Sequence, residues 1–444
     1  MRNLVEQPFA KNTVQNKSAN QPVVIVESEH ALPLVHLGIV LRTGSVHDPK
    51  GLEGLTRMTA RMLRMGTRKL SAQEVEEQID SLGAQLSVGS APSYVQVSGV
   101  VVAHNLEAFF QLVSELVTKP AFRASDLARA KRETIAELVG VVDDDRALAA
   151  RHFRSFALGK HPYGRSVVGT TQSVRTITRE AVLAHYAKHF VASNVIVSMA
   201  GAVDAERVQQ LVDKYLQLPS GRVPKFETPE TTMAKGRRLV LVDKPERTQT
   251  QVIVGTLGTH VLDPDHTALQ VANVVFGGLF TARLTHEVRS VRGWSYGASS
   301  SLGHDRQREL WSMWTFPAAK DAFNCLSLQL DLYEDWVANG VRPSELKRAK
   351  SFLVKSHAFE IDTPQKRLDQ RIEAELFGLP HDYFEGFTKR VKQVNVETAN
   401  AALRKRLSRR DLTIGIVATA SELQSTFEKL PGLTEVKVVP FDKV

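Results

Sequence analysis

The chain has 444 residues, which is too many for one ordinary hydrophobic core, so two to four domains are expected. Its hydrophobic (43%) and charged (24%) fractions are those of globular proteins, and no window approaches the apolar run of about 20 residues that spans a membrane. The net charge of +9 is spread along the chain, which favours acidic partners but not nucleic-acid binding, and the single cysteine excludes an internal disulfide and a cysteine-rich metal site.

Residues 1–22 are predicted to be an N-terminal extension. The first twenty residues are polar and mixed, and they lack the apolar centre of a signal peptide. Two interpretations follow: the protein stays inside the cell, or an export signal has already been removed.

The stretch GLTRMTARMLRMGTRKL (residues 54–70) is predicted to be a helix. It would place four arginines on one face, at the spacing i, i+4, i+7 and i+11: Arg57, Arg61, Arg64 and Arg68. The stretch contains no Asp or Glu, so a carboxylate partner must come from another part of the chain or from another molecule. The alternative is that these arginines only solvate a surface.

Further elements follow in chain order. SAQEVEEQIDSLG begins with a serine N-cap and ends at Gly83, which predicts a short helix. Residues 86–102 alternate between apolar and polar positions, as strands do, and residues 105–120 and 125–142 are amphipathic in the way of helices.

An internal duplication is visible in two pairs of segments. VIVESEH (24–30) resembles VLVDKPE (240–246), and SDLARAK (125–131) resembles SELKRAK (344–350), at offsets of 216 and 219 residues. Residues 221–236 carry prolines and glycines and are predicted to be a linker. The chain is therefore expected to have two domains of one architecture, 23–220 and 237–444.

The expected fold class is α+β, in which each half has a mixed, mostly antiparallel sheet with helices packed on one face. The sequence contains neither GxGxxG nor GxxxxGK[ST], so nucleotide binding has no support.

Three segments resemble one family of proteins. Residues 51–88 resemble the segment that carries the inverted zinc motif, HxxEH, in the M16 family (insulinase, pitrilysin and mitochondrial processing peptidase). Residues 161–204 are similar to a later segment of the same domain, and VFGGLFTARLTHEVRSVRGWSYGASSSL (275–302) resembles the family's C-domain segment. The chain length suits the short M16B subfamily, whose members form a clam shell from two such chains.

The resemblance places the zinc motif on residues that cannot hold zinc. The positions of His, Glu and His fall on Arg57, Ala60 and Arg61, and the later ligand position falls on Leu138, with Glu137 next to it. A guanidinium stays protonated, has no lone pair to give and repels a dication. Ala60 has no carboxylate to serve as the general base. The chain alone is therefore predicted to lack a zinc site.

The second half keeps a different family feature, an Arg and a Tyr seven residues apart, which in the family reach the substrate at the zinc. The matching residues are Arg289 and Tyr296. Residues 281–293 are expected to form a helix that buries Leu284, Val288 and Val291 and carries Arg289 in its last turn. Residues 294–302 are expected to form a strand with Tyr296 near its start, so the two side chains are expected to converge. The alternative is a helix-terminal Arg facing its own dipole and a core Tyr.

Two further pairs of residues have weaker support as functional-site residues. Gly277 and Gly278 are predicted to form a tight turn and to let a substrate or partner backbone approach closely. His185 and His189 have the i, i+4 spacing of a zinc pair, but no third ligand is nearby in the sequence, so metal binding there is disfavoured.

The resemblance implies a function for the assembled protein. It implies a non-catalytic, substrate-binding subunit of a heteromeric zinc metallopeptidase, which contributes Arg289 and Tyr296 to a homologous HxxEH-bearing partner and acts on unfolded peptides. No cofactor is expected in this chain, and zinc is expected in the partner. The alternatives are an inert scaffold subunit and a homodimer with residual activity, which would need a metal site. The periplasm is the expected compartment, because paired bacterial members are often exported.

Overall fold

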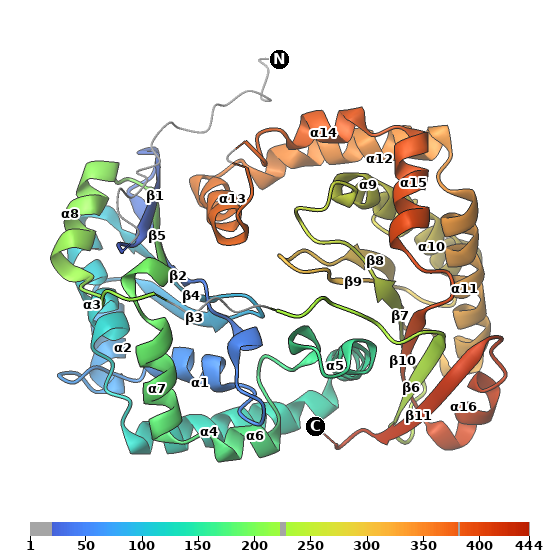
Figure 1. Ribbon diagram of the computed structural model, residues 1–444, viewed down its shortest axis with the longest axis horizontal. Coiled ribbons are helices and arrows are strands. Elements are labelled where there is room, and N and C mark those ends of the chain that lie inside the picture. The colour runs from blue at the N-terminus through green and yellow to red at the C-terminus, as the bar shows by residue number, and fades with distance from the viewer. Residues whose placement is uncertain (1–19, 223–227, 381, 444) are drawn as a thin grey trace. The chain divides into compact units, whose positions relative to one another are not determined.

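The computed structural model describes residues 20–222, 228–380 and 382–443. Residues 1–19 of the predicted N-terminal extension and residues 223–227 of the predicted linker lie outside the described residues. The chain divides into two compact units (Figure 1). Within the described residues, unit 1 comprises 20–138, 166–222 and 358–385, and unit 2 comprises 139–165, 228–357 and 386–443.

Unit 1 is built on a five-stranded sheet of order β1-β5-β2-β4-β3. β5 is parallel to β1 and antiparallel to β2, and the remaining pairs are antiparallel. Its strands are β1 (Val23–Ser28), β2 (Leu34–Leu41), β3 (Gln85–Ser90), β4 (Val95–Val102) and β5 (Val195–Gly201). Its helices are α1 (Leu55–Leu63), α2 (Ala72–Ser81), α3 (Leu106–Thr118), α4 (Ala124–Gly140), α6 (Thr171–Thr176), α7 (Arg179–His189), α8 (Ala205–Tyr215) and α13 (Pro364–Phe377).

Unit 2 is built on a six-stranded sheet of order β11-β6-β10-β7-β9-β8. Its strands are β6 (Arg237–Asp243), β7 (Gln251–Leu257), β8 (Ala298–Leu302), β9 (Leu310–Thr315), β10 (Leu412–Ala418) and β11 (Leu433–Pro440). Its helices are α5 (Asp145–Leu158), α9 (His266–Phe276), α10 (Arg283–Thr285), α11 (Ala322–Asn339), α12 (Pro343–Ser356), α14 (Phe387–Gln393), α15 (Val396–Arg406) and α16 (Ala420–Phe427).

The two sheets share one strand order. When β6 to β10 are aligned with β1 to β5, the order β6-β10-β7-β9-β8 repeats β1-β5-β2-β4-β3, and β11 is an additional edge strand. The predicted α+β class with two similar halves is confirmed. The two pairs of similar segments fall on equivalent elements: β1 with β6, and α4 with α12.

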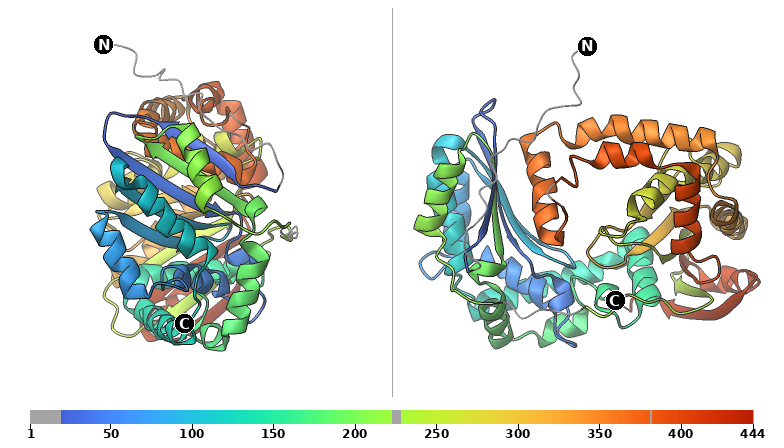
Figure 2. Two further views of the ribbon diagram at one scale, coloured as in Figure 1. Left: turned by 90° about the vertical axis from the view of Figure 1, so that its left-hand side faces the viewer. Right: turned by 45° about the horizontal axis from the view of Figure 1, so that its top comes forward.

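Each unit includes one helix from the other half of the sequence. α13 packs against β1 and β5 in unit 1, and α5 packs against β6, β7 and β10 in unit 2 (Figures 1 and 2). The residues of β1 show why helices cover both faces of the unit 1 sheet. Successive residues of a strand point to opposite faces. Val24 and Val26 belong to the core cluster that includes α3 and α8, whereas Glu27 points the other way and pairs with Arg367 of α13.

In unit 2 the equivalent space is filled by Phe153 of α5. A Cβ atom at Gly255 would lie 2.7 Å from its ring, and one at Gly415 would lie 2.8 Å from its Cβ, so both strands approach α5 closely through glycine. Helices thus occupy both faces of each sheet, where the sequence predicted them on one. Across the described residues, every helix is too short or too polar to serve as a membrane span.

Candidate functional site

The α1 helix carries Arg57, Ala60 and Arg61, which the resemblance places at the HxxEH positions and which are called the degenerate motif below, and a buried carboxylate fixes the start of this helix. Asp48 accepts hydrogen bonds from the backbone N–H groups of Gly54 (2.7 Å) and Thr56 (2.8 Å) and from the Thr56 hydroxyl (2.6 Å). Burial raises the pKa of Asp48 to about 6, although these hydrogen bonds oppose the rise. Gly54 has φ +94°, and a Cβ there would lie 2.5 Å from the carbonyl oxygen of Val168, so the turn into α1 requires glycine.

The helix is shorter than the sequence predicted. It ends at Leu63 with Arg64 as its C-cap, and Gly66 follows with φ +105°. Arg68 therefore lies in the loop after the helix and does not continue the arginine face, which corrects the expectation of four arginines on one helical face. Arg57, Arg61 and Arg64 remain together.

The partners of these arginines come from other helices of the same unit. Arg57 donates from one nitrogen, Nη2, to both carboxylate oxygens of Glu137 (2.8 and 2.9 Å). Arg61 pairs with Glu133 at 2.6 Å, and Arg64 forms a two-pronged pair with Glu76 at 2.7 and 2.6 Å. Two matched i, i+4 series, arginines on α1 and glutamates on α4, thus face each other.

Ala60 and Leu138 have become part of the hydrophobic core. Ala60 is 2% exposed and Leu138 is 1% exposed. The carboxylate that faces the α1 arginines belongs to Glu137, one residue before the position predicted from the resemblance. Glu133 and Glu137 were missed as partners, and their i, i+4 spacing, which matches that of Arg57 and Arg61, was the signal in the sequence.

These residues do not fit a zinc ion. Permanently protonated guanidinium groups occupy the positions that the resemblance assigns to two imidazoles, and the nearby carboxylates are already paired with them. Among the described residues, no three or more His, Cys, Asp or Glu side chains are grouped so as to hold a metal ion.

His185 and His189 are held in a buried hydrogen-bonded network. Their rings lie 4.5 Å apart, His185 Nε2 is 3.0 Å from the Thr56 hydroxyl, and His189 Nδ1 is 3.2 Å from the Thr43 hydroxyl. Burial lowers the pKa of His185 to about 4 and that of His189 to about 3, so both rings are neutral at pH 7. The arrangement is that of satisfied core histidines.

A cavity of about 540 Å³ opens beside the α1 arginines. Its lining comes from α1, α2, the edge strand β3 and α4: Arg57, Ala60, Arg61, Arg64, Met65, Ala72, Gln73, Glu76, Val88, Gly89, Ser90, Arg129 and Glu133. The degenerate motif thus borders an open space.

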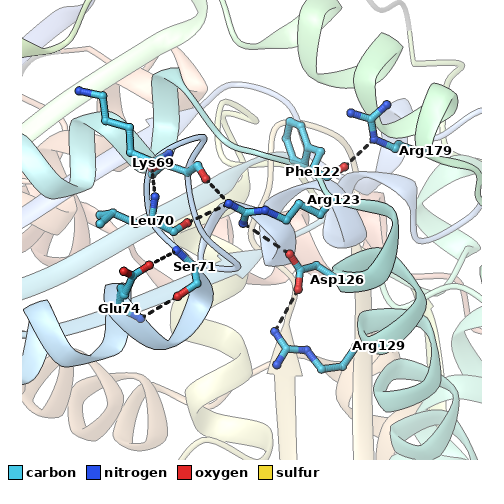
Figure 3. Close-up of polar contacts among 10 residues, drawn as sticks. Lys69, Leu70, Ser71, Glu74, Phe122, Arg123, Asp126, Arg129 and Arg179 are labelled. Carbon is cyan, nitrogen blue, oxygen red and sulfur yellow. Dashed lines mark hydrogen bonds and ion pairs between the residues drawn. The ribbon is translucent and has the colours of Figure 1, made fainter.

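Figure 3 shows polar contacts around the loop between α1 and α2 and at the start of α4, where Arg129 belongs to the cavity lining. Arg123 donates to the carbonyl oxygens of Thr67 (2.8 Å) and Leu70 (3.3 Å), which holds the loop between α1 and α2. Asp126 lies 3.8 Å from the Arg123 guanidinium and 3.5 Å from that of Arg129, so it orients Arg129 at the cavity wall (Figure 3). α2 then begins with the predicted serine cap, a reciprocal pair of bonds between Ser71 and Glu74.

In unit 2, Arg289 and Tyr296 converge, as predicted from their spacing. The Arg289 guanidinium lies 4.2 Å from the centre of the Tyr296 ring and 4.5 Å from that of Phe280. Tyr296 is 76% exposed and Phe280 is 62% exposed, so the guanidinium is held between two rings at the surface of the unit. The alternative of a core tyrosine is excluded.

The helix that carries Arg289 differs from the prediction. After α10 the chain forms a π-helical turn, His286–Val291, in place of a regular α-helix. Leu284 and Val288 are fully buried as predicted, but Val291 is 57% exposed. A π turn holds more residues than an α turn, so Val291 at its end is rotated away from the apolar face.

Stacking leaves the donors of Arg289 available. The guanidinium carbon lies within 4.5 Å of both ring centres, and the N–H groups of Arg289 form no hydrogen bond with the described residues. The nearby Glu287 pairs with Arg292, and within the described part of the chain no carboxylate forms an ion pair with Arg289. Phe280 was missed by sequence reasoning, although an aromatic residue two positions after the Gly277–Gly278 pair was its signal.

The two glycines have reasons within the chain for being glycine. A Cβ at Gly277 would lie 2.6 Å from the backbone nitrogen of Ser300, and one at Gly278 would lie 2.7 Å from Cα of Val274. Internal packing therefore accounts for both, and a role in substrate binding stays a prediction.

Comparisons with known proteins give matches to one family over most of the chain. Residues 23–171 match the family profile described as insulinase (peptidase family M16), and residues 176–353 match the one described as peptidase M16 inactive domain. An uncharacterized zinc protease of Mycobacterium tuberculosis is 27% identical over 387 residues, covering 85% of this chain and 88% of the relative. A non-peptidase homologue of Helicobacter pylori is 22% identical over 399 residues, covering 89% and 91%. The crystal structure of a peptidase M16 inactive domain from Pseudomonas fluorescens matches with a TM-score of 0.85 at 25% identity, over 91% of this chain and 97% of that one.

Proposed function

Because the chain belongs to the M16 peptidase family and carries a match to that family's inactive domain, we propose that it is the non-catalytic, substrate-binding subunit of a heteromeric zinc peptidase that cleaves peptides. One observation carries the proposal. The motif positions on α1 are occupied by arginines engaged with glutamates, while Arg289 is stacked at the surface with no carboxylate partner among the described residues.

The chemistry of Arg289 and Tyr296 suits a peptide carbonyl. A guanidinium and a phenol both donate hydrogen bonds, and two such donors aimed at one carbonyl oxygen orient the peptide and stabilise the negative charge that develops on that oxygen. The rings of Phe280 and Tyr296 hold the Arg289 guanidinium in place, so little side-chain entropy is lost when it binds. A homologous chain with an intact HxxEH motif would supply the zinc and the general base.

An extended peptide has sheet edges on which to bind. β3 is an outer strand of the unit 1 sheet, and β8, which begins two residues after Tyr296, is an outer strand of the unit 2 sheet. Strand addition to such an edge uses main-chain hydrogen bonds, so it accepts unfolded peptides of many sequences. We propose the periplasm as the compartment of the assembled pair, because paired bacterial members of the family that the chain resembles are often exported.

The experiment mixes this chain with a homologous HxxEH-bearing chain from the same organism and measures cleavage of an internally quenched peptide. Arg289→Ala is expected to lower kcat by about a hundredfold or more, the usual cost of losing one such donor, and Tyr296→Phe by a similar factor. Arg404→Ala, an exposed arginine of the same unit, is the matched control and should leave the rate unchanged. Wild-type rates in both site variants would refute the assignment.

A second candidate, an inert assembly subunit, is favoured by one observation: the relative from Helicobacter pylori is named a non-peptidase homologue. The same mixture separates the two functions. A scaffold would form a stable complex with the HxxEH-bearing chain, and removing this chain would leave peptide cleavage unaltered.

A further inference from the structure

The cavity beside the degenerate motif is rich in guanidinium groups. Four arginines and two glutamates line it: Arg57, Arg61, Arg64, Arg129, Glu76 and Glu133. The two carboxylates that complete the ion pairs, Glu137 and Asp126, do not line the cavity. The wall therefore presents an excess of positive charge to the space, although the pairs taken together are balanced.

The ion pairs along the wall are open to exchange. The carboxylates of Glu76, Glu133 and Glu137 are 43–46% exposed, and pairs at such exposure contribute little because water screens them. Arg129 reaches Asp126 only at 3.5 Å. Arg57 uses Nη2 for both of its bonds, and its Nη1 has no hydrogen-bond partner among the described residues. Because Arg57 Nη1 is buried, the donors that an incoming carboxylate would meet are the weakly engaged ones of Arg61 and Arg129.

The edge strand leads a peptide to this space. Val88, Gly89 and Ser90 of β3 line the cavity, and the Ser90 hydroxyl is a second buried polar atom that has no partner in the described chain. A peptide added to the β3 edge would point every second side chain to one face of the sheet. One acidic side chain, or the terminal carboxylate of a peptide that ends there, would reach the arginines.

We infer that this cavity binds a carboxylate of the peptide substrate, contributed by an acidic side chain or by the C terminus. Planar guanidinium groups match a carboxylate with two parallel hydrogen bonds, and such charge-assisted pairs are stronger than neutral ones. The position that holds a cation in zinc-bearing relatives would here hold an anion. The inference rests on the proposed function in one respect, namely that the ligand is a peptide.

The test measures peptide binding to the isolated full chain by fluorescence anisotropy. Three labelled peptides share one neutral sequence: one has a free C-terminal carboxylate, one is C-terminally amidated, and one is amidated with a single central Asp. At least one of the carboxylate-bearing peptides is expected to bind about tenfold more tightly than the neutral amide, the value of one charge-assisted interaction. Which of them does so identifies the source of the carboxylate.

Variants assign the preference to the cavity. Arg61→Gln and Arg129→Gln should each reduce it several-fold, whereas Arg132→Gln, an exposed arginine of α4 outside the cavity lining, should leave it unchanged. Arg129→Gln keeps the test valid if Arg61→Gln fails to fold, because Arg129 is an exposed side chain. Equal binding of all three peptides, or a preference that survives both variants, overturns the inference. The cleavage assay with Arg289→Ala is independent of this result, so the two proposals can fail separately.

Discussion

Replacing Arg367 with methionine is expected to destabilise unit 1 by about 3 kcal/mol. Arg367 donates from Nε to Glu27 (2.8 Å), from Nη2 to Glu29 (2.6 Å) and from Nη1 to the carbonyl oxygen of Ile361 (3.0 Å). Its side chain is 9% exposed and that of Glu27 is 2% exposed, so the central pair is buried. Methionine keeps most of the volume and removes the charge.

The magnitude follows from what remains around Glu27. Breaking a buried ion pair by removing one partner costs about 3–5 kcal/mol, because the other charge stays buried without compensation. Here Arg371 still lies 3.4 Å from Glu27, and Glu29 is 41% exposed and returns to water, so the lower end of that range applies. With a urea dependence of about 2–3 kcal/mol per M, the transition of unit 1 should move by about 1 M.

The assay is urea unfolding, combined with hydrogen exchange of α13 and β1 to assign the transition to unit 1. Lys366→Met is the matched control, because the Lys366–Asp362 pair is 47% exposed on both sides and is worth no more than about 0.5 kcal/mol. Adding Glu27→Gln to Arg367→Met should recover part of the loss, since the buried charge is then gone. If Arg367→Met is as stable as Lys366→Met, the buried pair does not hold α13 to the sheet.

Two further outcomes follow from the site. Phe280→Ala should lower the cleavage rate of the assembled pair only about two- to fivefold, against the much larger loss for Arg289→Ala, because one exposed cation–π contact is worth about 0.5–1 kcal/mol; equal losses in the two variants would mean that Phe280 does more than hold Arg289. The pKa of Asp48 is raised to about 6, so between pH 4 and 6 the folded chain binds more protons than the unfolded chain. Protonation of Asp48 therefore stabilises the folded state fully below about pH 4, and this stabilisation is lost as the pH rises through 6. The difference in unfolding free energy between wild type and Asp48→Asn should therefore fall across that window, and a difference that is constant with pH would contradict the assignment.

The duplication was predictable from the sequence because equivalent segments of the two units make the same contacts and therefore keep similar residues. Lys131 of α4 donates to the carbonyl oxygens of Arg175 and Ile177, and Lys350 of α12 donates to those of Lys392 and Val394. A lysine that ends SDLARAK and SELKRAK thus fastens the same local structure in both units. The convergence of Arg289 with Tyr296 was predictable because only a short connection separates the helical turn that carries Arg289 from β8, and Tyr296 lies within that connection.

The exchange of α5 and α13 could not be predicted from local patterns. An amphipathic helix indicates that one of its faces is buried, but not which sheet covers it. The π-helical turn at 286–291 and the pairing of Glu133 and Glu137 with the α1 arginines also depend on contacts made over many residues. The domain boundaries predicted at 220 and 237 divide the sequence, whereas the two units divide it into interleaved segments.

The position of α13 late in the sequence determines when unit 1 can be completed during synthesis. Synthesis proceeds from the N terminus, so β1 to β5 leave the ribosome before residues 364–377, which complete their second layer. During that interval the face of β1 that bears Glu27 has no covering helix. α5 is likewise synthesised before the sheet that it covers, whose first strand begins at Arg237. Neither half of the sequence contains every helix of the unit to which its sheet belongs.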